Sequence, residues 1–332
     1  MTYEEFKELI LQRMRQLTLE EYPNFRVEIE SRPSVNSNDE TICFWNTDED
    51  ATSSPRIHLP EMYRMVENYP FEMVVRRMEQ TARAAIEESK QVSSDIIQRE
   101  AAPQRIFFQL INTEQNKELL ATLPHRNLQD LSLIYRYQVE LNGDVTASTV
   151  INQPLAEYLQ LDEDSLYEIA LTNTRNLFTP AVIPMAHMME HLLPDVALEN
   201  LKQYSMYVIT NESGSFGAAN VVYSDILDEL AKKCDSNLYI IPSSLHELIA
   251  VSEKEVDLKT LENMVYEVNA TQLCQKERLS NQIYYYDKET QEFSMATNSP
   301  HVRLDDEYYA MNPPQDMEAC DEEMEEGLQM GM

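Results

Sequence analysis

One five-residue segment, HMMEH at residues 187–191, has the spacing of a metal-dependent active site. In zinc peptidases with the pattern His-x-x-Glu-His, two histidines one helical turn apart bind Zn²⁺ and the glutamate polarises the attacking water. Glu267 lies 76 residues beyond His191 and could supply a third ligand. One hypothesis is therefore a zinc-dependent hydrolase that binds the metal through His187, His191 and Glu267. Glu190 would then be the general base.

The residues around this segment favour a different role. Prolines at 184 and 194 limit any helix to about ten residues. At about 100° per residue, the histidines would lie opposite an apolar stripe, on the solvated side of that helix. The stripe consists of Met185, Met188, Met189, Leu192 and Leu193. A pattern this short also arises by chance in about one such chain in a hundred. A solvated helix face is therefore favoured over a metal site.

A second segment carries the residue types of a serine hydrolase and follows a predicted strand at residues 238–241. It contains Ser243, Ser244, His246 and Glu247. The members of a catalytic triad must converge from separate segments, whereas these side chains belong to one turn. Ser244 and Glu247 also have the spacing of a capping box. This segment therefore predicts a capped turn without catalytic function.

The connection Gly214-Ser215-Phe216-Gly217 follows another predicted strand and is the only glycine cluster before the C-terminal tail. It matches neither the Gly-x-Gly-x-x-Gly pattern of dinucleotide-binding folds nor the lysine-containing phosphate-binding loop. A hairpin turn between two strands is the expected structure. No nucleotide cofactor is expected.

These segments lie in or beside residues 203–253, where the predicted elements are clearest. The pattern indicates a strand at 206–209, the glycine turn and a second strand, followed by a helix behind Ser224. A strand at 238–241, the capped turn and a last strand complete this stretch. Such a succession predicts a compact α/β core.

The remaining elements predict an α+β fold, with mixed or antiparallel sheets of hairpins packed by amphipathic helices, because no strand-helix repeat runs through the chain. Ser165 and Glu168 predict a capping box for a helix at 166–178, and Asn142-Gly143 predicts a tight hairpin turn. The other predicted elements are helices at 3–17, 71–90 and after Asp257, strands at 25–30, 41–46 and 105–111, and a final hairpin at 283–295. The expected division is an N-terminal lobe at 1–180, a C-terminal lobe at 181–297 and a disordered acidic tail at 298–332.

The net charge of −32 over 332 residues limits the class of partner. A field of this sign repels nucleic acids and anionic lipid surfaces, so a neutral or basic protein partner is expected. The four cysteines are far apart and form no Cys-x-x-Cys pair, which is typical of reduced thiols in the cytoplasm. The amphipathic N-terminus lacks the pattern of a signal peptide, and no apolar run is long enough to cross a membrane.

Two stretches, NTRNLFTPAVIPM and YVITNESGSFGAANVVYSDILDELAKKCDSNLYIIPSSLHELIAV, resemble a bacterial family from the Firmicutes that is classified as a domain of unknown function. The similarity extends over most of residues 1–295. The resemblance implies an α+β fold and a cytosolic bacterial origin. It assigns no activity, cofactor or catalytic residue.

The sequence thus favours a non-catalytic, cytoplasmic interaction module with a strongly acidic surface. Two alternatives remain open. The first is a nucleic-acid mimic that inhibits a basic DNA-binding protein, which would require a contiguous stripe of carboxylates. The second is the zinc-dependent hydrolase, which would require His187, His191 and a third ligand at one point, with Glu190 beside them.

Overall fold

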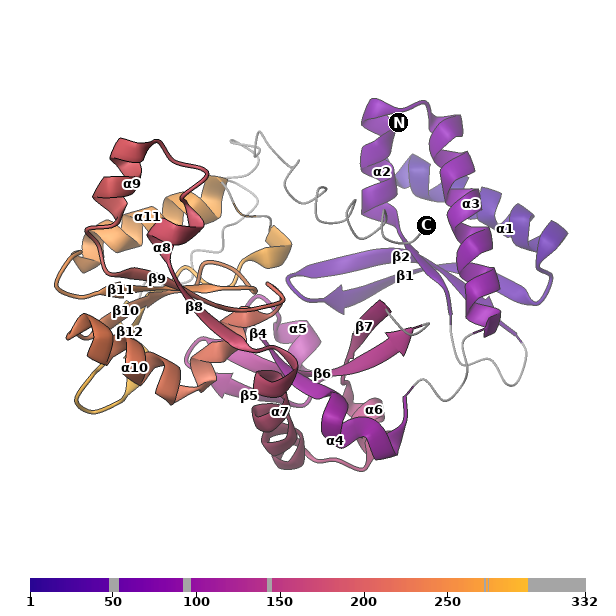
Figure 1. Cartoon of the computed structure of the whole chain (residues 1–332). Helices are drawn as coiled ribbons and strands as arrows, with labels where there is room; N and C mark the ends of the chain where they lie inside the picture. The colour runs from indigo at the N-terminus through magenta and orange to yellow at the C-terminus, as the bar shows by residue number, and fades with distance from the viewer. Residues whose placement is uncertain (48–53, 92–96, 142–144, 272, 274, 298–332) are drawn as a thin grey trace. The chain divides into compact units, whose positions relative to one another are not determined.

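The computed structural model of the chain describes residues 1–47, 54–91, 97–141, 145–271, 273 and 275–297 (Figure 1). The chain forms two compact units. The first contains Met1–Ala101 and Val139–Ala147, and the second contains Ala102–Gln138 and the chain from Ser148 onward. The predicted boundary at 180/181 falls within the second unit. The bounds of independently folding domains remain a prediction. The predicted tail at 298–332 lies outside the described residues.

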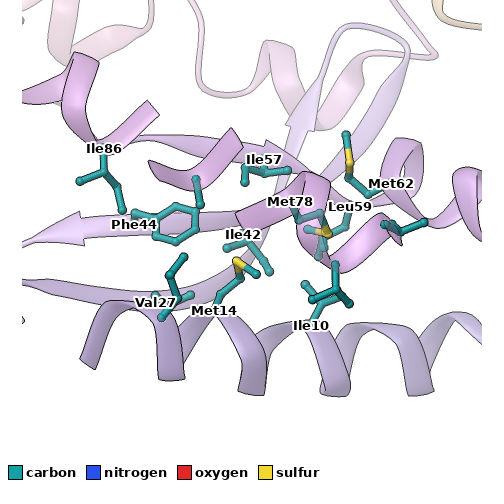
Figure 2. Packing of buried hydrophobic residues seen from close by; sticks show 14 of the residues in the cluster. Ile10, Met14, Val27, Ile42, Phe44, Ile57, Leu59, Met62, Met78 and Ile86 are labelled. Carbon is teal, nitrogen blue, oxygen red and sulfur yellow. The ribbon is translucent and has the colours of Figure 1, made fainter. Parts of the chain in front are cut away.

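The first unit packs helices on one face of a three-stranded antiparallel sheet with the order β1-β2-β3. Its elements are α1 (Tyr3–Glu21), β1 (Phe25–Ser34), β2 (Ser37–Asn46), β3 (Arg56–His58), α2 (Leu59–Asn68), α3 (Phe71–Gln91) and η2 (Arg99–Ala101). Figure 2 shows Ile10 and Met14 of α1 among Val27 of β1 and Ile42 of β2. At the start of β1, Phe25 and Val27 are buried and Arg26 is exposed, because successive side chains point to opposite faces of the sheet.

The helix predicted at 3–17 is confirmed and continues to Glu21. Phe6, Ile10 and Met14 are fully buried, whereas Leu9 is exposed. The helix begins at a capping box in which Glu5 N–H donates to the Thr2 hydroxyl. Strands β1 and β2 extend beyond the predicted ranges of 25–30 and 41–46, because Asn36 adopts a left-handed conformation with φ of 58° and closes a tight turn.

The second unit contains two antiparallel sheets. One has six strands in the order β13-β12-β10-β11-β9-β8, and the other has the path β4-β6-β5 with β7 paired to β6. The elements up to the middle of the unit are α4 (Ala102–Arg105), β4 (Ile106–Asn112), α5 (Lys117–Leu120), β5 (His125–Leu128), β6 (Leu131–Leu141), β7 (Val145–Val150), α6 (Gln153–Leu159), α7 (Glu163–Leu177) and β8 (Pro180–Pro184). The rest are α8 (Met185–Met188), α9 (Asp195–Leu201), β9 (Met206–Asn211), η3 (Gly217–Val222), α10 (Ser224–Cys234), β10 (Leu238–Ile241), β11 (Leu248–Ser252), α11 (Leu258–Thr271), η4 (Gln275–Glu277), β12 (Tyr284–Tyr286) and β13 (Phe293–Met295).

Strand β4 is buried at every position because both of its faces are covered. On one face, α7 packs against the strand and the Tyr167 ring contacts the Phe108 ring. At the edge of β4, the Thr174 hydroxyl accepts a hydrogen bond of 2.8 Å from Phe108 N–H. On the other face, the Phe107 ring contacts the rings of Phe178 and Phe216. The smaller sheet therefore lies between α7 and the start of η3.

The α+β fold with antiparallel hairpins is confirmed. One predicted cap is wrong, since the carboxylate of Asp162 caps α7 and accepts a hydrogen bond from Ser165 N–H at 2.9 Å. The helix consequently starts three residues earlier than Ser165 and Glu168 predict. The strands on both sides of Asn142-Gly143 are present, and the turn itself lies outside the described residues.

Candidate functional site

The HMMEH segment does not form the predicted ten-residue helix. Helix α8 contains only Met185–Met188, and the chain then continues as a turn toward α9. His187 and His191 are therefore not paired on successive turns of one helix. The Nδ1 atom of His187 lies 3.5 Å from Oε2 of Glu190, and both side chains are exposed to solvent.

The structure does not assemble the proposed zinc ligands. Glu267 is an exposed residue of α11. Among the described residues, no group of three or more His, Cys, Asp or Glu side chains could hold a metal ion. The hydrolase hypothesis thus lacks the convergent ligands that zinc requires, although Glu190 does lie beside His187.

The exposure of His187 leads to a prediction about the alanine variant. Because 73% of its side chain is exposed, His187→Ala should change the free energy of unfolding by at most about 0.5 kcal/mol. Elemental analysis should find substoichiometric zinc, and a chelator should leave the melting temperature unchanged. Stoichiometric zinc that disappears in the variant would restore the hydrolase hypothesis.

The hydroxyls and imidazole near Ser243 also do not form a catalytic relay. The Ser243 hydroxyl donates to Glu247 Oε1 at 3.2 Å, and the Ser244 hydroxyl accepts from the backbone N–H of His246 at 3.0 Å. The imidazole Nδ1 of His246 instead accepts from Phe216 N–H at 3.2 Å. The predicted capping box is wrong, because no helix begins at Ser244 and the chain continues directly into β11. The predicted turn is present between β10 and β11.

The predicted glycine hairpin is a different structure. Phe216 adopts a left-handed conformation with φ of 59° and precedes η3, where a second strand was expected. Gly217 packs so tightly that an added Cβ would lie 2.4 Å from the carbonyl oxygen of His246. The turn therefore places the Phe216 ring beside Phe107 and joins the two sheets of the second unit.

Exposed apolar side chains lie within and on both sides of the HMMEH segment in the sequence. Of the fourteen large hydrophobic side chains exposed in the described part of the chain, six lie within 28 residues. They are Leu177, Val182, Met188, Leu192, Val196 and Tyr204. Within this group, Val182, Met188, Leu192 and Val196, from β8, α8, the following turn and α9, are named the α8–α9 surface. The four residues are close in sequence, and α8 contacts both β8 and α9, whereas exposed hydrophobic residues of soluble proteins are normally scattered singly.

This finding corrects the predicted burial of the apolar stripe. Met188 and Leu192 belong to that stripe, yet both are exposed. A ten-residue helix would have presented the stripe to one neighbour, whereas the short α8 and the turn after it do not. The apolar residues were visible in the sequence, but their spacing was interpreted as one face of a helix that does not form.

The charged groups beside the α8–α9 surface are mainly acidic. Lys202 forms an ion pair of 2.8 Å with Glu199. A hydrogen bond to Glu199, together with the charges of Glu199, Glu190 and Asp195, raises the pKa of the Lys202 ammonium. Three carboxylates thus act on one ammonium, which leaves a local excess of negative charge.

Comparison with known families agrees with the resemblance seen in the two quoted stretches. The model of the family of unknown function DUF5688 matches residues 3–288. The chain belongs to the DUF5688 family. No curated protein and no solved structure shows a significant match.

In this DUF5688 protein, the α8–α9 surface includes an edge strand that begins and ends with proline. Strand β8 is the terminal strand of the six-stranded sheet, and Pro180 and Pro184 occupy its first and last positions. Proline lacks an N–H donor and is typical of edges protected from further strand pairing. Contacts to this surface should therefore be made by side chains.

Within the described residues, no helix combines the length and apolar character needed to cross a membrane.

Proposed function

We propose that this DUF5688 protein is a non-catalytic interaction module that binds a basic protein through the α8–α9 surface. The observation that carries the proposal is the exposure of Leu192 and Val196 beside the acidic residues of α9. A compact apolar group with a polar rim is the usual composition of a protein-binding site. A cytoplasmic location is part of the same proposal.

The apolar residues supply the affinity in this proposal. Leu192 and Val196 are 73% and 77% exposed, so a partner that covers them removes most of their surface from water. Full burial of a leucine or valine side chain contributes about 1.5–3 kcal/mol. A contact centred on these two residues would therefore supply a large part of the free energy of a micromolar complex.

The charge supports a basic partner over a second copy of the same chain. In a symmetric dimer, the carboxylates of Glu190, Asp195 and Glu199 would face the same carboxylates of the other copy. Like charges across an interface are unfavourable, and the overall charge of −32 adds to the repulsion. Lysine and arginine residues around an apolar centre would complement both features of the surface.

The ion pairs of the described residues favour this function over a nucleic-acid mimic. In the first unit, Arg83 lies 2.8 Å from Glu21. In the second unit, Lys254 and Lys288 both pair with Asp235. Bases thus interrupt the carboxylates on both units, whereas a mimic of a phosphate backbone needs a continuous negative stripe. Neither nucleic acid nor a membrane is a proposed partner.

The test compares three immobilised forms of the full chain in an extract of the source cells. In the double variant Leu192→Ser/Val196→Ser, the charge is unchanged and the apolar surface is removed. The control is Leu19→Ser, which changes a leucine that is 79% exposed on α1. We expect a basic protein to be captured by the wild type and the control, and its affinity for the double variant to fall about tenfold or more.

Two outcomes would contradict the proposal. In the first, the captured protein binds the double variant and the wild type equally well. In the second, sedimentation velocity shows a wild-type dimer that the double variant disrupts, which would make a second copy the occupant of the surface. The binding of purified partner should also weaken as salt is raised, because part of the attraction is between exposed charges.

A further inference from the structure

Arg136 on β6 is a largely buried cation whose hydrogen bonds within the described part of the chain all go to neutral groups. Its Nε–H donates to the Ser148 hydroxyl at 2.9 Å, and one terminal N–H donates to the Ser148 carbonyl at 3.0 Å. The other terminal nitrogen donates to Oε1 of Gln109 on β4 at 2.8 Å. The two neighbouring strands therefore fix the orientation of the guanidinium.

No carboxylate of the described residues forms an ion pair with Arg136. Burial alone lowers the pKa of this guanidinium, to about 10. The charge is thus removed from water without a compensating negative group, which is unfavourable in a protein interior. Other arginines of the second unit differ, since Arg126 pairs with Glu163 and Arg175 pairs with Asp225.

The Phe216 ring packs against this guanidinium. The guanidinium carbon of Arg136 lies 5.1 Å from the centroid of the Phe216 ring, which is within the range of a cation–π contact. Two contacts fix the backbone that carries this ring. Phe216 N–H donates a hydrogen bond to His246, and Gly217 packs closely against its neighbours. The local structure therefore keeps the guanidinium in position and compensates only part of its charge.

The hydrogen bonds of Arg136 leave two donors available. A guanidinium has five N–H groups, and the bonds to Ser148 and Gln109 use three of them. One N–H therefore remains on each terminal nitrogen. These two donors can hydrogen-bond to the oxygens of a carboxylate or phosphate group.

We infer that Arg136 binds the carboxylate or phosphate group of a small molecule, with Gln109 and Ser148 as positioning residues. The anion supplies the negative charge that no carboxylate of the described residues provides. The Phe216 ring offers an apolar contact for the part of the ligand next to the anionic group. This site is independent of the α8–α9 surface, because none of its residues belongs to that surface.

The test measures binding of inorganic phosphate, acetate and citrate to the full chain by calorimetry and thermal denaturation at constant ionic strength. We expect at least one of these anions to raise the melting temperature. Arg136→Lys should weaken its binding about tenfold or more, because a lysine ammonium keeps the charge and loses the fork. Arg136→Gln should abolish binding. Ser148→Ala should weaken it by a smaller factor because only one acceptor is lost.

The matched control is Arg175→Gln, which removes an arginine that already has a carboxylate partner. This variant should bind the anion as tightly as the wild type. Absence of any shift at about 10 mM of all three anions would overturn the inference. So would a shift of equal size in Arg136→Lys and the wild type, because binding would then not depend on the fork. If Arg136→Gln does not fold, Arg136→Lys and Ser148→Ala still decide the outcome.

Discussion

Replacing Gly217 with alanine should lower the free energy of unfolding by about 3 kcal/mol. The added Cβ would lie 2.4 Å from the carbonyl oxygen of His246, 2.6 Å from the hydroxyl oxygen of Thr210 and 2.8 Å from its Cα. Two of these three atoms belong to the backbone, so no side-chain rotation can relieve the overlap. Either β9 or the turn before β11 must move, and both belong to the core of the second unit.

Gly214 provides the matched control for this substitution. It lies in the same connection and has a left-handed φ of 68°, but no atom lies within 4 Å of its added Cβ. Gly214→Ala should therefore cost only about 1–2 kcal/mol, the strain of a non-glycine residue in that conformation. Chemical denaturation of the two variants measures the difference. A loss for Gly217→Ala no larger than that for Gly214→Ala would contradict the role of close packing, because Gly217 does not have a positive φ.

The same pair of variants separates stability from the anion site. Gly217→Ala should displace Phe216, which contacts Arg136, and should weaken anion binding in the fraction that remains folded. Gly214→Ala should leave anion binding unchanged because it does not alter the packing of the ring.

The secondary structure was largely predictable because periodicity reflects which face of an element is buried. Helix α3 has its predicted position, and β1 and β2 contain the strands predicted at 25–30 and 41–46. The segment Gly217–Val222 does not, because its alanines and valines pack as a 3₁₀ helix in contact with β4 and β9. Tertiary packing overrides the strand propensity of valine at this point. A single sequence does not contain that information.

The candidate sites were less predictable because they depend on what surrounds each residue. The alternation of β6 places Arg136 opposite Tyr135 and Tyr137, on the face that a two-layer fold would leave in solvent. The Phe216 turn covers that face instead, and it was predicted to be a simple hairpin. That no carboxylate of the described residues pairs with Arg136 likewise depends on segments that are distant in sequence. Only the exposed character of His187 and Glu190 was anticipated correctly from spacing.

Replacing Asp130 with alanine should lower the free energy of unfolding by about 3 kcal/mol, because two buried hydroxyls would lose their acceptor. The Asp130 carboxylate accepts hydrogen bonds from the Tyr284 hydroxyl at 2.6 Å and from the Ser280 hydroxyl at 2.7 Å. Both donors are buried. Burial, together with the charge of Asp130, raises the pKa of Tyr284 well above its ordinary value, so this hydroxyl remains a donor over the accessible pH range.

A double-mutant cycle tests whether this loss comes from the hydrogen bond. Tyr284→Phe removes the hydroxyl donor, so Asp130→Ala should cost about 1–2 kcal/mol less in that background than in the wild type. Asp228→Ala is the control, because that carboxylate accepts from the Tyr286 hydroxyl at 2.7 Å at a more solvated position and should cause a smaller loss. Strictly additive effects of Asp130→Ala and Tyr284→Phe would contradict the explanation. Asp130 and Tyr284 are 154 residues apart in the sequence. Additivity would therefore also mean that their contact does not stabilise the packing of β12 against the smaller sheet.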